Sequence, residues 1–143
     1  MPETYNPNNI LAKILRDEIP SARVYEDQHA IAFMDVMPQA PGHTLVIPRD
    51  PSRDLLDAKP ETLSALVQAA QKVAQGVKKA MNADGITLMQ FNGAAAGQTI
   101  FHLHFHIIPR FEGTPLKSHA GDMADMRELE DIAARIREAV KKL

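Results

Sequence analysis

Three histidines occupy alternate positions in one short run of the chain, Phe101-His102-Leu103-His104-Phe105-His106-Ile107-Ile108-Pro109. Alternation predicts a strand with the three imidazoles on one face and Leu103, Phe105 and Ile107 on the other. The apolar face can enter a core while the histidine face stays polar and open. Because the histidine side chain changes charge near physiological pH, a row of three indicates proton transfer, nucleophilic attack, metal binding or phosphate binding.

A metal is the first of these alternatives. On a regular strand, residues two apart are about 7 Å from each other and residues four apart about 13 Å, whereas a zinc–nitrogen bond is about 2 Å long. Two of the three histidines can share an ion but all three cannot, so a metal site needs further ligands from His43, His119 or a carboxylate. Since the sequence holds no second dense ligand cluster and no cysteine, we expect no metal and no other cofactor.

Acid–base and nucleophilic chemistry fits the run better. Three close imidazoles disfavour one another's protonation, so at least one stays neutral at pH 7 and keeps a nucleophilic nitrogen. His104 is the only one with a histidine on both sides, which makes it the candidate nucleophile, with His102 and His106 as orienting or anion-binding groups. The alternative is a half-exposed strand face without chemistry.

The segment before the histidines favours an anionic substrate. Residues 92–98 form a predicted loop of small residues, Asn92-Gly93-Ala94-Ala95-Ala96-Gly97-Gln98. Its glycines allow close backbone approach, and free amide groups in such a loop can bind an anion. Gln98 and Thr99 add side-chain donors directly before the histidine strand.

The remaining elements must position these residues. Alternating and apolar runs predict strands at 23–26, 30–35, 44–47, 86–91 and 101–109. Helical spacing predicts a short helix capped by Asn9, a long helix at about 60–81 and a last amphipathic helix from about 125. Because strands and helices do not alternate regularly, the order favours an α+β fold with an antiparallel sheet over a doubly wound parallel sheet.

Length and composition set further limits. The 143 residues predict a single domain over 1–143, with a loose tail at 1–8 and a helical segment at 123–143. A net charge of −2 gives no reason to expect nucleic acid or acidic lipid as a partner. No apolar stretch approaches membrane-spanning length, and the N-terminus lacks an apolar secretory region, so we expect a cytoplasmic protein that does not contact membranes.

The histidine run resembles a known signature. His102-Leu103-His104-Phe105-His106-Ile107-Ile108 is similar to the motif of the histidine triad (HIT) superfamily, and the resemblance extends over about residues 9–110. Further segments resemble small bacterial HIT proteins of the Hint-like kind: Lys13-Ile14, Glu18-Ile19-Pro20-Ser21, Val24-Tyr25-Glu26-Asp27, Phe33-Met34-Asp35-Val36, Pro38 to Pro48, and Asn92-Gly93 with Ala96-Gly97-Gln98-Thr99.

The resemblance implies a fold and an activity. The implied fold is α+β, with a five-stranded antiparallel sheet, a long helix, a C-terminal helix and sheets joined across a homodimer. The implied activity is that of a hydrolase or nucleotidyl transferase, which cleaves purine nucleoside phosphoramidates or related nucleotide conjugates at the α-phosphate and releases a nucleoside monophosphate such as AMP. Two alternatives stay open: a dinucleoside polyphosphate hydrolase, and a nucleotide-binding or scaffold protein with incidental turnover.

The resemblance also implies roles for single residues. His104 attacks the α-phosphorus and forms a nucleotidyl-histidine intermediate, with support from His102, His106 and a fourth histidine, His43. Asp35 takes the ribose hydroxyls, which suits a carboxylate beside a vicinal diol. Phosphate oxygens and the leaving group are held by Asn92, Gly97, Gln98 and Thr99.

An apolar slot for the base is the last feature that the resemblance implies. Its members are Ile10, Leu11, Ile14, Phe33 and Val36. The Cys-x-x-Cys pair of many bacterial relatives, part of a structural zinc site, is replaced by Asn9 and Ala12, so structural zinc is not expected. His119 lies in a predicted loop at 111–122 that can reach the site.

Overall fold

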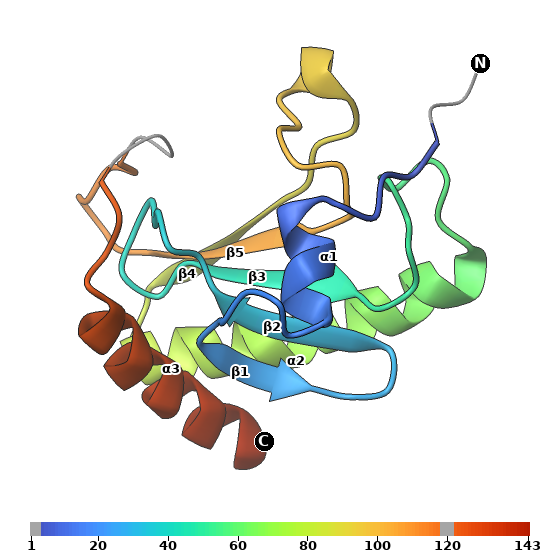
Figure 1. The fold of residues 1–143 in the computed structure, drawn as a ribbon. Helices are drawn as coiled ribbons and strands as arrows, with labels where there is room; N and C mark the ends of the chain where they lie inside the picture. Colours follow the sequence, from blue (N-terminus) through green and yellow to red (C-terminus); the bar gives the residue numbers. More distant parts are fainter. Residues whose placement is uncertain (1–3, 118–121) are drawn as a thin grey trace.

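The computed structural model describes residues 4–117 and 122–143. Within them, strands β1 (Arg23–Glu26), β2 (Ala30–Met34), β3 (Thr44–Pro48), β4 (Gly85–Met89) and β5 (Phe105–Arg110) form one sheet. The helices are α1 (Ile10–Leu15), α2 (Pro60–Met81) and α3 (Met126–Lys141), with a 3₁₀ turn, η1 (Ala94–Ala96). The sheet order is β1-β2-β3-β5-β4 and each pairing is antiparallel (Figure 1), so the predicted α+β fold is confirmed.

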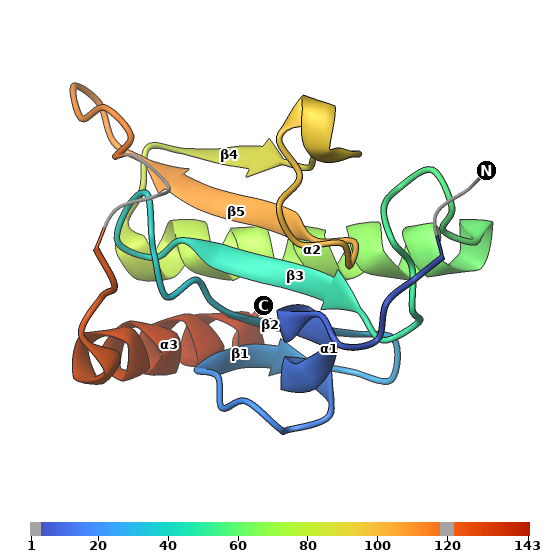
Figure 2. The same ribbon diagram turned by 45° about the horizontal axis from the view of Figure 1, so that its top comes forward.

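The sheet separates two apolar clusters because side chains alternate between its faces. On one face, Met34, Val46 and Ile107 join residues of α2 and α3 in the main core. On the other face, residues of β2 and β3 pack against α1: the cluster consists of Leu11, Ile14, Ile31, Phe33, Leu45 and Ile47. Figures 1 and 2 show α1 on the opposite side of the sheet from α2. His106 is opposite Leu45 in the β3–β5 register, so its side chain lies on the α1 face.

The histidine strand is shorter than predicted. β5 begins at Phe105, so His102 and His104 lie in an irregular segment before it. The alternation of burial holds nonetheless, because Leu103, Phe105 and Ile107 all enter the main core. The chain departs from the sheet where the N–H of Leu103 donates to the carbonyl of Ser52 at 2.8 Å instead of to a neighbouring strand.

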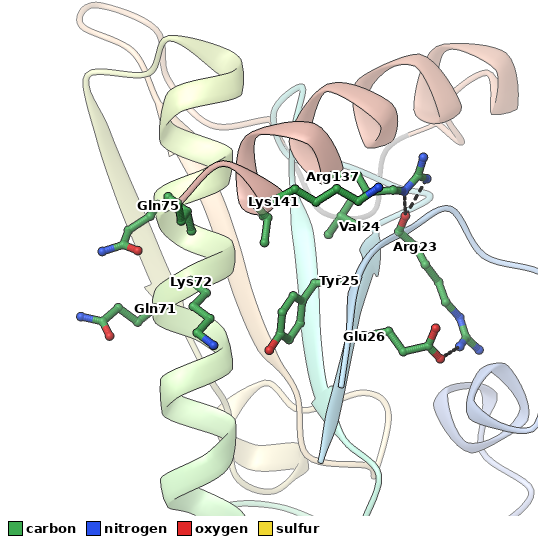
Figure 3. Close-up of a pocket in the computed structure, with 11 residues that line it drawn as sticks. Arg23, Val24, Tyr25, Glu26, Gln71, Lys72, Gln75, Arg137 and Lys141 are labelled. Atoms are coloured by element: carbon green, nitrogen blue, oxygen red, sulfur yellow. Dashed lines mark hydrogen bonds and ion pairs between the residues drawn. The ribbon is translucent and has the colours of Figure 1, made fainter. Parts of the chain in front are cut away.

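Strand β1 lies at one edge of the sheet, and α3 protects it. Arg137 donates from Nε and Nη2 to the carbonyl of Arg23 at 3.1 and 2.7 Å, and so occupies an acceptor that a foreign strand could use. Beside this contact lies a cavity of about 710 Å³ between β1, α2 and α3 (Figure 3). Arg23 also forms ion pairs with Asp17 and Glu26. Two of the cations that line the cavity, Arg23 and Arg137, therefore already make contacts that stabilise the fold.

None of the described helices has the length and apolar character that crossing a bilayer requires.

Helices α2 and α3 approach each other closely at Gly76, where a side chain would have no room. A Cβ built at Gly76 would lie 2.4 Å from Cγ2 of Val140 and 3.4 Å from its backbone nitrogen. Valine has a stiff χ1, so Cγ2 cannot easily move away.

We expect Gly76→Ala to destabilise the fold by about 1–3 kcal/mol, because overpacking outweighs the gain in helix propensity of about 1 kcal/mol. Urea denaturation measures the change in the free energy of unfolding. In a Val140→Ala background the same substitution should become neutral or stabilising, since the colliding methyl group is gone. A Gly76→Ala protein as stable as the parent would contradict this packing argument.

Candidate active site

The structure brings four predicted histidines into one cluster on the α1 face. His43 directly precedes β3, His102 and His104 precede β5, and His106 lies within β5. The ring centroids of His104 and His106 are 5.0 Å apart, and those of His43 and His106 are 5.2 Å apart. Two segments of the chain that are far apart in sequence therefore meet at one place.

The cluster is more enclosed than an open strand face. His43 and His102 have no exposed surface, His106 is 5% exposed and His104 is 9% exposed. The prediction of an open histidine face is therefore wrong. His104 remains the most exposed of the four, so it is the ring that a substrate reaches most easily.

The ring of His104 is oriented by the backbone of its neighbour. Its Nδ1 lies 2.6 Å from the carbonyl oxygen of His102. Because a carbonyl oxygen only accepts hydrogen bonds, Nδ1 must carry the proton, and the lone pair of the neutral ring is then on Nε2. An imidazole held in this tautomer is suited to nucleophilic attack through Nε2.

His102 is held as a neutral ring by partners on both sides. Its Nε2 donates to the carbonyl of Pro48 at 2.9 Å, and its Nδ1 accepts from the hydroxyl of Tyr5 at 2.6 Å. Burial lowers the pKa of His102 from its ordinary value of 6.5 to about 4, against the opposing effect of the Pro48 carbonyl. At pH 7 the His102 ring is uncharged, and its role is structural.

His43 and His106 form a directed pair. The backbone N–H of Gln39 donates to Nδ1 of His43 at 3.0 Å, so the proton of neutral His43 is on Nε2. That Nε2 lies 3.0 Å from Nδ1 of His106 and 3.4 Å from Oδ2 of Asp35. His106 therefore accepts at Nδ1, and its own proton is on Nε2, where it can serve as a donor.

Asp35, His43 and His106 also have the spacing of a metal site. Among the described residues they form the one such group, with ligand atoms within 4.8 Å of one another, and two imidazoles with a carboxylate suit zinc. The hydrogen bond from Gln39 opposes this use. A ligating imidazole normally donates its second ring N–H to an acceptor, whereas Nδ1 of His43 accepts from an N–H. Metal binding at Nε2 of His43 would require that bond to break.

Backbone N–H groups of the small-residue loop donate to acceptors within the loop itself. The N–H groups of Ala96 and Gln98 donate to the carbonyl of Gly93 at 3.1 and 3.0 Å, and that of Gly97 donates to Ala94 at 3.0 Å. The N–H of Gly93 donates to Oε1 of Gln98 at 2.7 Å. The prediction of free backbone amides is wrong for these four groups, because the loop folds around η1.

The Gln98 side chain braces this loop. Its Nε2 donates to the carbonyls of Arg53 and Ile100 at 2.9 and 3.0 Å, which uses both amide hydrogens. Oδ1 of Asn92 accepts from the backbone N–H of Leu55 at 2.9 Å. Thr99, by contrast, is exposed. Of the predicted phosphate-loop side chains, Gln98 is therefore committed to structure while Thr99 faces solvent.

The five predicted slot residues differ in their exposure. Leu11, Ile14 and Phe33 are buried in the α1-face cluster. Ile10 and Val36 are exposed. The first three stabilise the fold, and the last two remain candidates for contact with a ligand.

Several groups at the site were not predicted from the sequence. The carbonyl of Pro48 and the N–H of Gln39 act through the backbone, so their side chains carry no signal. Tyr5 does carry a signal in the sequence, since it is an aromatic residue in an otherwise polar tail. The structure differs from the predicted loose tail at this point, because Tyr5 is bonded to His102.

Comparison with known proteins assigns the class. Residues 16–113 match the model of the HIT domain. The protein hit of Bacillus subtilis is 37% identical over 134 residues, which cover 90% of this chain and 92% of the relative. The chain therefore belongs to the HIT family.

Solved structures agree in fold. A Hit-like protein of Bartonella henselae, described as involved in cell-cycle regulation and solved with an unknown ligand, is 60% identical, with a TM-score of 0.89 over 95% of this chain and 99% of that one. A histidine triad nucleotide-binding protein of Sulfolobus tokodaii is 36% identical, with a TM-score of 0.84 over 92% and 91%. A zinc-bound histidine triad family protein of Mycobacterium smegmatis is 32% identical, with a TM-score of 0.83 over 94% of each chain.

One relative has a name that states a reaction. Adenylylsulfatase HINT3 of Arabidopsis thaliana is 38% identical over 103 residues, which cover 72% of this chain and 52% of the plant protein.

The lowered pKa of His102 predicts a dependence of stability on pH. The pKa of His102 is 6.5 in the unfolded chain and about 4 in the folded chain. Between these two pH values the unfolded chain therefore binds a proton on this residue that the folded chain does not bind. The stability is therefore full above pH 6.5 and falls as the pH falls to 4, by about 3 kcal/mol for this residue.

We expect His102→Gln to lose that part of the slope. The free energy of unfolding, measured by urea titration at several pH values, should decline less steeply than in the parent between pH 6.5 and 4. His29→Gln is the control, since His29 is exposed. Equal slopes in His102→Gln and the parent would refute the assignment.

Proposed function

We propose that the protein hydrolyses purine nucleoside phosphoramidates or related nucleotide conjugates at the α-phosphate and releases a nucleoside monophosphate such as AMP. The hydrogen bond of 2.6 Å from Nδ1 of His104 to the His102 carbonyl is the observation that carries the proposal. It keeps the lone pair on Nε2, in the most exposed ring of the cluster.

The proposed reaction has two steps. First, Nε2 of His104 forms a bond to the α-phosphorus while the bond from phosphorus to the leaving group breaks, and the leaving group takes up a proton from solvent. Water then attacks the same phosphorus and the bond from phosphorus to Nε2 breaks, which restores the neutral ring and frees the nucleoside monophosphate, while the proton lost by the water returns to solvent. The Nε2–H of His106, whose ring lies 5.0 Å from that of His104, is the candidate donor to an α-phosphate oxygen.

Other residues are proposed to bind the rest of the nucleotide. Asp35 is the candidate acceptor for the ribose hydroxyls, and its carboxylate also lies 3.4 Å from Nε2 of His43. Thr99 and Asn92 are the candidates near the leaving group. Ile10 and Val36 are the exposed members of the proposed base slot.

The leaving group distinguishes the alternatives. An amine leaves from a phosphoramidate, a nucleotide leaves from a dinucleoside polyphosphate, and sulfate leaves from adenylyl sulfate, the substrate class in the name of the plant relative. Comparing kcat/KM on these three substrates identifies the preferred class. Tight AMP binding without turnover on any of them would favour a scaffold protein, and loss of turnover with a chelator would favour a metal enzyme.

We expect His104→Ala and His104→Gly to lower kcat on an adenosine phosphoramidate by about 10³-fold or more, because the nucleophile is lost. The circular dichroism spectrum should not change. In the parent protein, acid quenching during turnover followed by mass spectrometry should find a nucleotidyl adduct on His104. His29→Ala is the matched control, since this histidine is exposed and away from the cluster. Full activity in His104→Ala would refute the mechanism.

We also propose that two copies join along β4. This strand pairs only with β5 among the described residues, so its other edge is open. Unlike β2 and β3, it is only partly buried, and Leu88 is 55% exposed. The adjoining helix α2 exposes Val67 by 54%. An open edge with apolar neighbours is a surface that a partner usually covers.

Leu88→Glu is expected to convert the dimer to a monomer, because a charge would be buried at the joint. Light scattering after size-exclusion chromatography measures the mass. Leu56→Glu is the control, an exposed leucine in a loop on another part of the chain. A parent protein that is monomeric at micromolar concentration would contradict the proposal.

A further inference from the structure

The chain before α1 is fastened at both of its ends. We call residues 4–9 the N-terminal arm. Its last residue, Asn9, caps α1 by accepting from the N–H of Ala12 at 2.8 Å. Nδ2 of Asn9 donates to the carbonyl of Asn6 at 2.8 Å, and Arg16 of the α1 C-terminus donates to the carbonyl of Pro7 at 2.9 Å. The arm therefore follows the position of α1.

At its other end the arm contacts the histidine cluster through Tyr5. The hydroxyl of Tyr5 lies 2.6 Å from Nδ1 of His102, and the two rings meet edge to face with centroids 5.6 Å apart. Nε2 of His102 donates to the carbonyl of Pro48, so Nδ1 of the neutral ring has a lone pair and the Tyr5 hydroxyl must donate. His102 is fully buried, so within the structure this hydroxyl satisfies an acceptor that water cannot reach.

We propose that Tyr5 is a positioning residue for the nucleophile, which acts through His102. Tyr5 fixes the His102 ring from one side while Pro48 fixes it from the other, and the carbonyl of the same residue aligns His104 at 2.6 Å. The proposal rests on the proposed function, because it assigns a role in the step that His104 performs.

The cost of losing Tyr5 should appear in the chemical step. Without the hydroxyl, Nδ1 of His102 is a buried acceptor with no donor, so the ring and its backbone relax. A small rotation of the His102 carbonyl turns Nε2 of His104 away from the phosphorus, and attack depends strongly on that alignment. Nucleotide contacts elsewhere on the site would not change.

The test compares the two tyrosines of the chain. Tyr5→Phe removes only the hydroxyl, and we expect kcat on an adenosine phosphoramidate to fall about fivefold while KM stays within about twofold. Tyr25→Phe is the matched control. Its hydroxyl donates to Asp27 in the hairpin of β1 and β2, outside the cluster of His43, His102, His104 and His106, so kcat should not change. In a His102→Gln background, Tyr5→Phe should cause no further loss, because the coupling partner is absent.

A second readout does not depend on turnover. In protein labelled with ¹⁵N-histidine, the Nδ1 resonance of His102 should move to higher frequency in Tyr5→Phe, because a lone pair that loses its donor is deshielded. An unmoved resonance would refute the contact. A moved resonance with unchanged kcat would refute the positioning role and leave the proposed function standing. If the parent hydrolyses no nucleotide conjugate, the proposed function fails and the positioning role fails with it, while the resonance still tests the contact.

Discussion

The site depends on one acceptor, the backbone carbonyl of His102. A carbonyl oxygen cannot donate and does not titrate, so it holds the proton of His104 on Nδ1 at any pH where the ring is neutral. The carbonyl is itself held, since the ring of His102 is bonded to Pro48 and the next N–H is bonded to Ser52. The end of β3 and the segment that follows it therefore set the direction in which the candidate nucleophile points.

A second constraint sets the other two rings. The N–H of Gln39 donates to Nδ1 of His43, so the proton of His43 is on Nε2, which faces His106 and Asp35. His106 accepts at Nδ1, and its own proton is therefore on Nε2. Both rings accept a hydrogen bond at Nδ1, so His43 and His106 are neutral in this arrangement. That matters because the cluster is buried, where a cation would be disfavoured by desolvation. The same bond is what makes Asp35, His43 and His106 a poor metal site despite their spacing.

Local pattern predicted much of this structure, and contacts distant in sequence account for what it missed. The 3.6-residue period located α2 at Pro60–Met81, and the alternation at Leu103, Phe105 and Ile107 identified the core face. The start of β5 was misplaced because Ser52 takes the N–H of Leu103 out of the sheet. The loop amides were misjudged because three of them donate to the carbonyls of Gly93 and Ala94 and the fourth donates to the Gln98 side chain. No periodicity encodes a contact between Tyr5 and His102, 97 residues apart.

The two faces of the sheet are unequally supported, and the site is on the weaker one. The main core is covered by two long helices, whereas the other face is covered by α1, a helix of 6 residues. A helix of that length is not stable alone, so it persists through the cap from Asn9 and through burial of Leu11 and Ile14. The N-terminal arm joins this helix to the histidine cluster. One end of the arm caps α1 through Asn9 and the other end donates to His102 through Tyr5, so the segment that holds α1 in place on the weaker face also supports the histidine cluster.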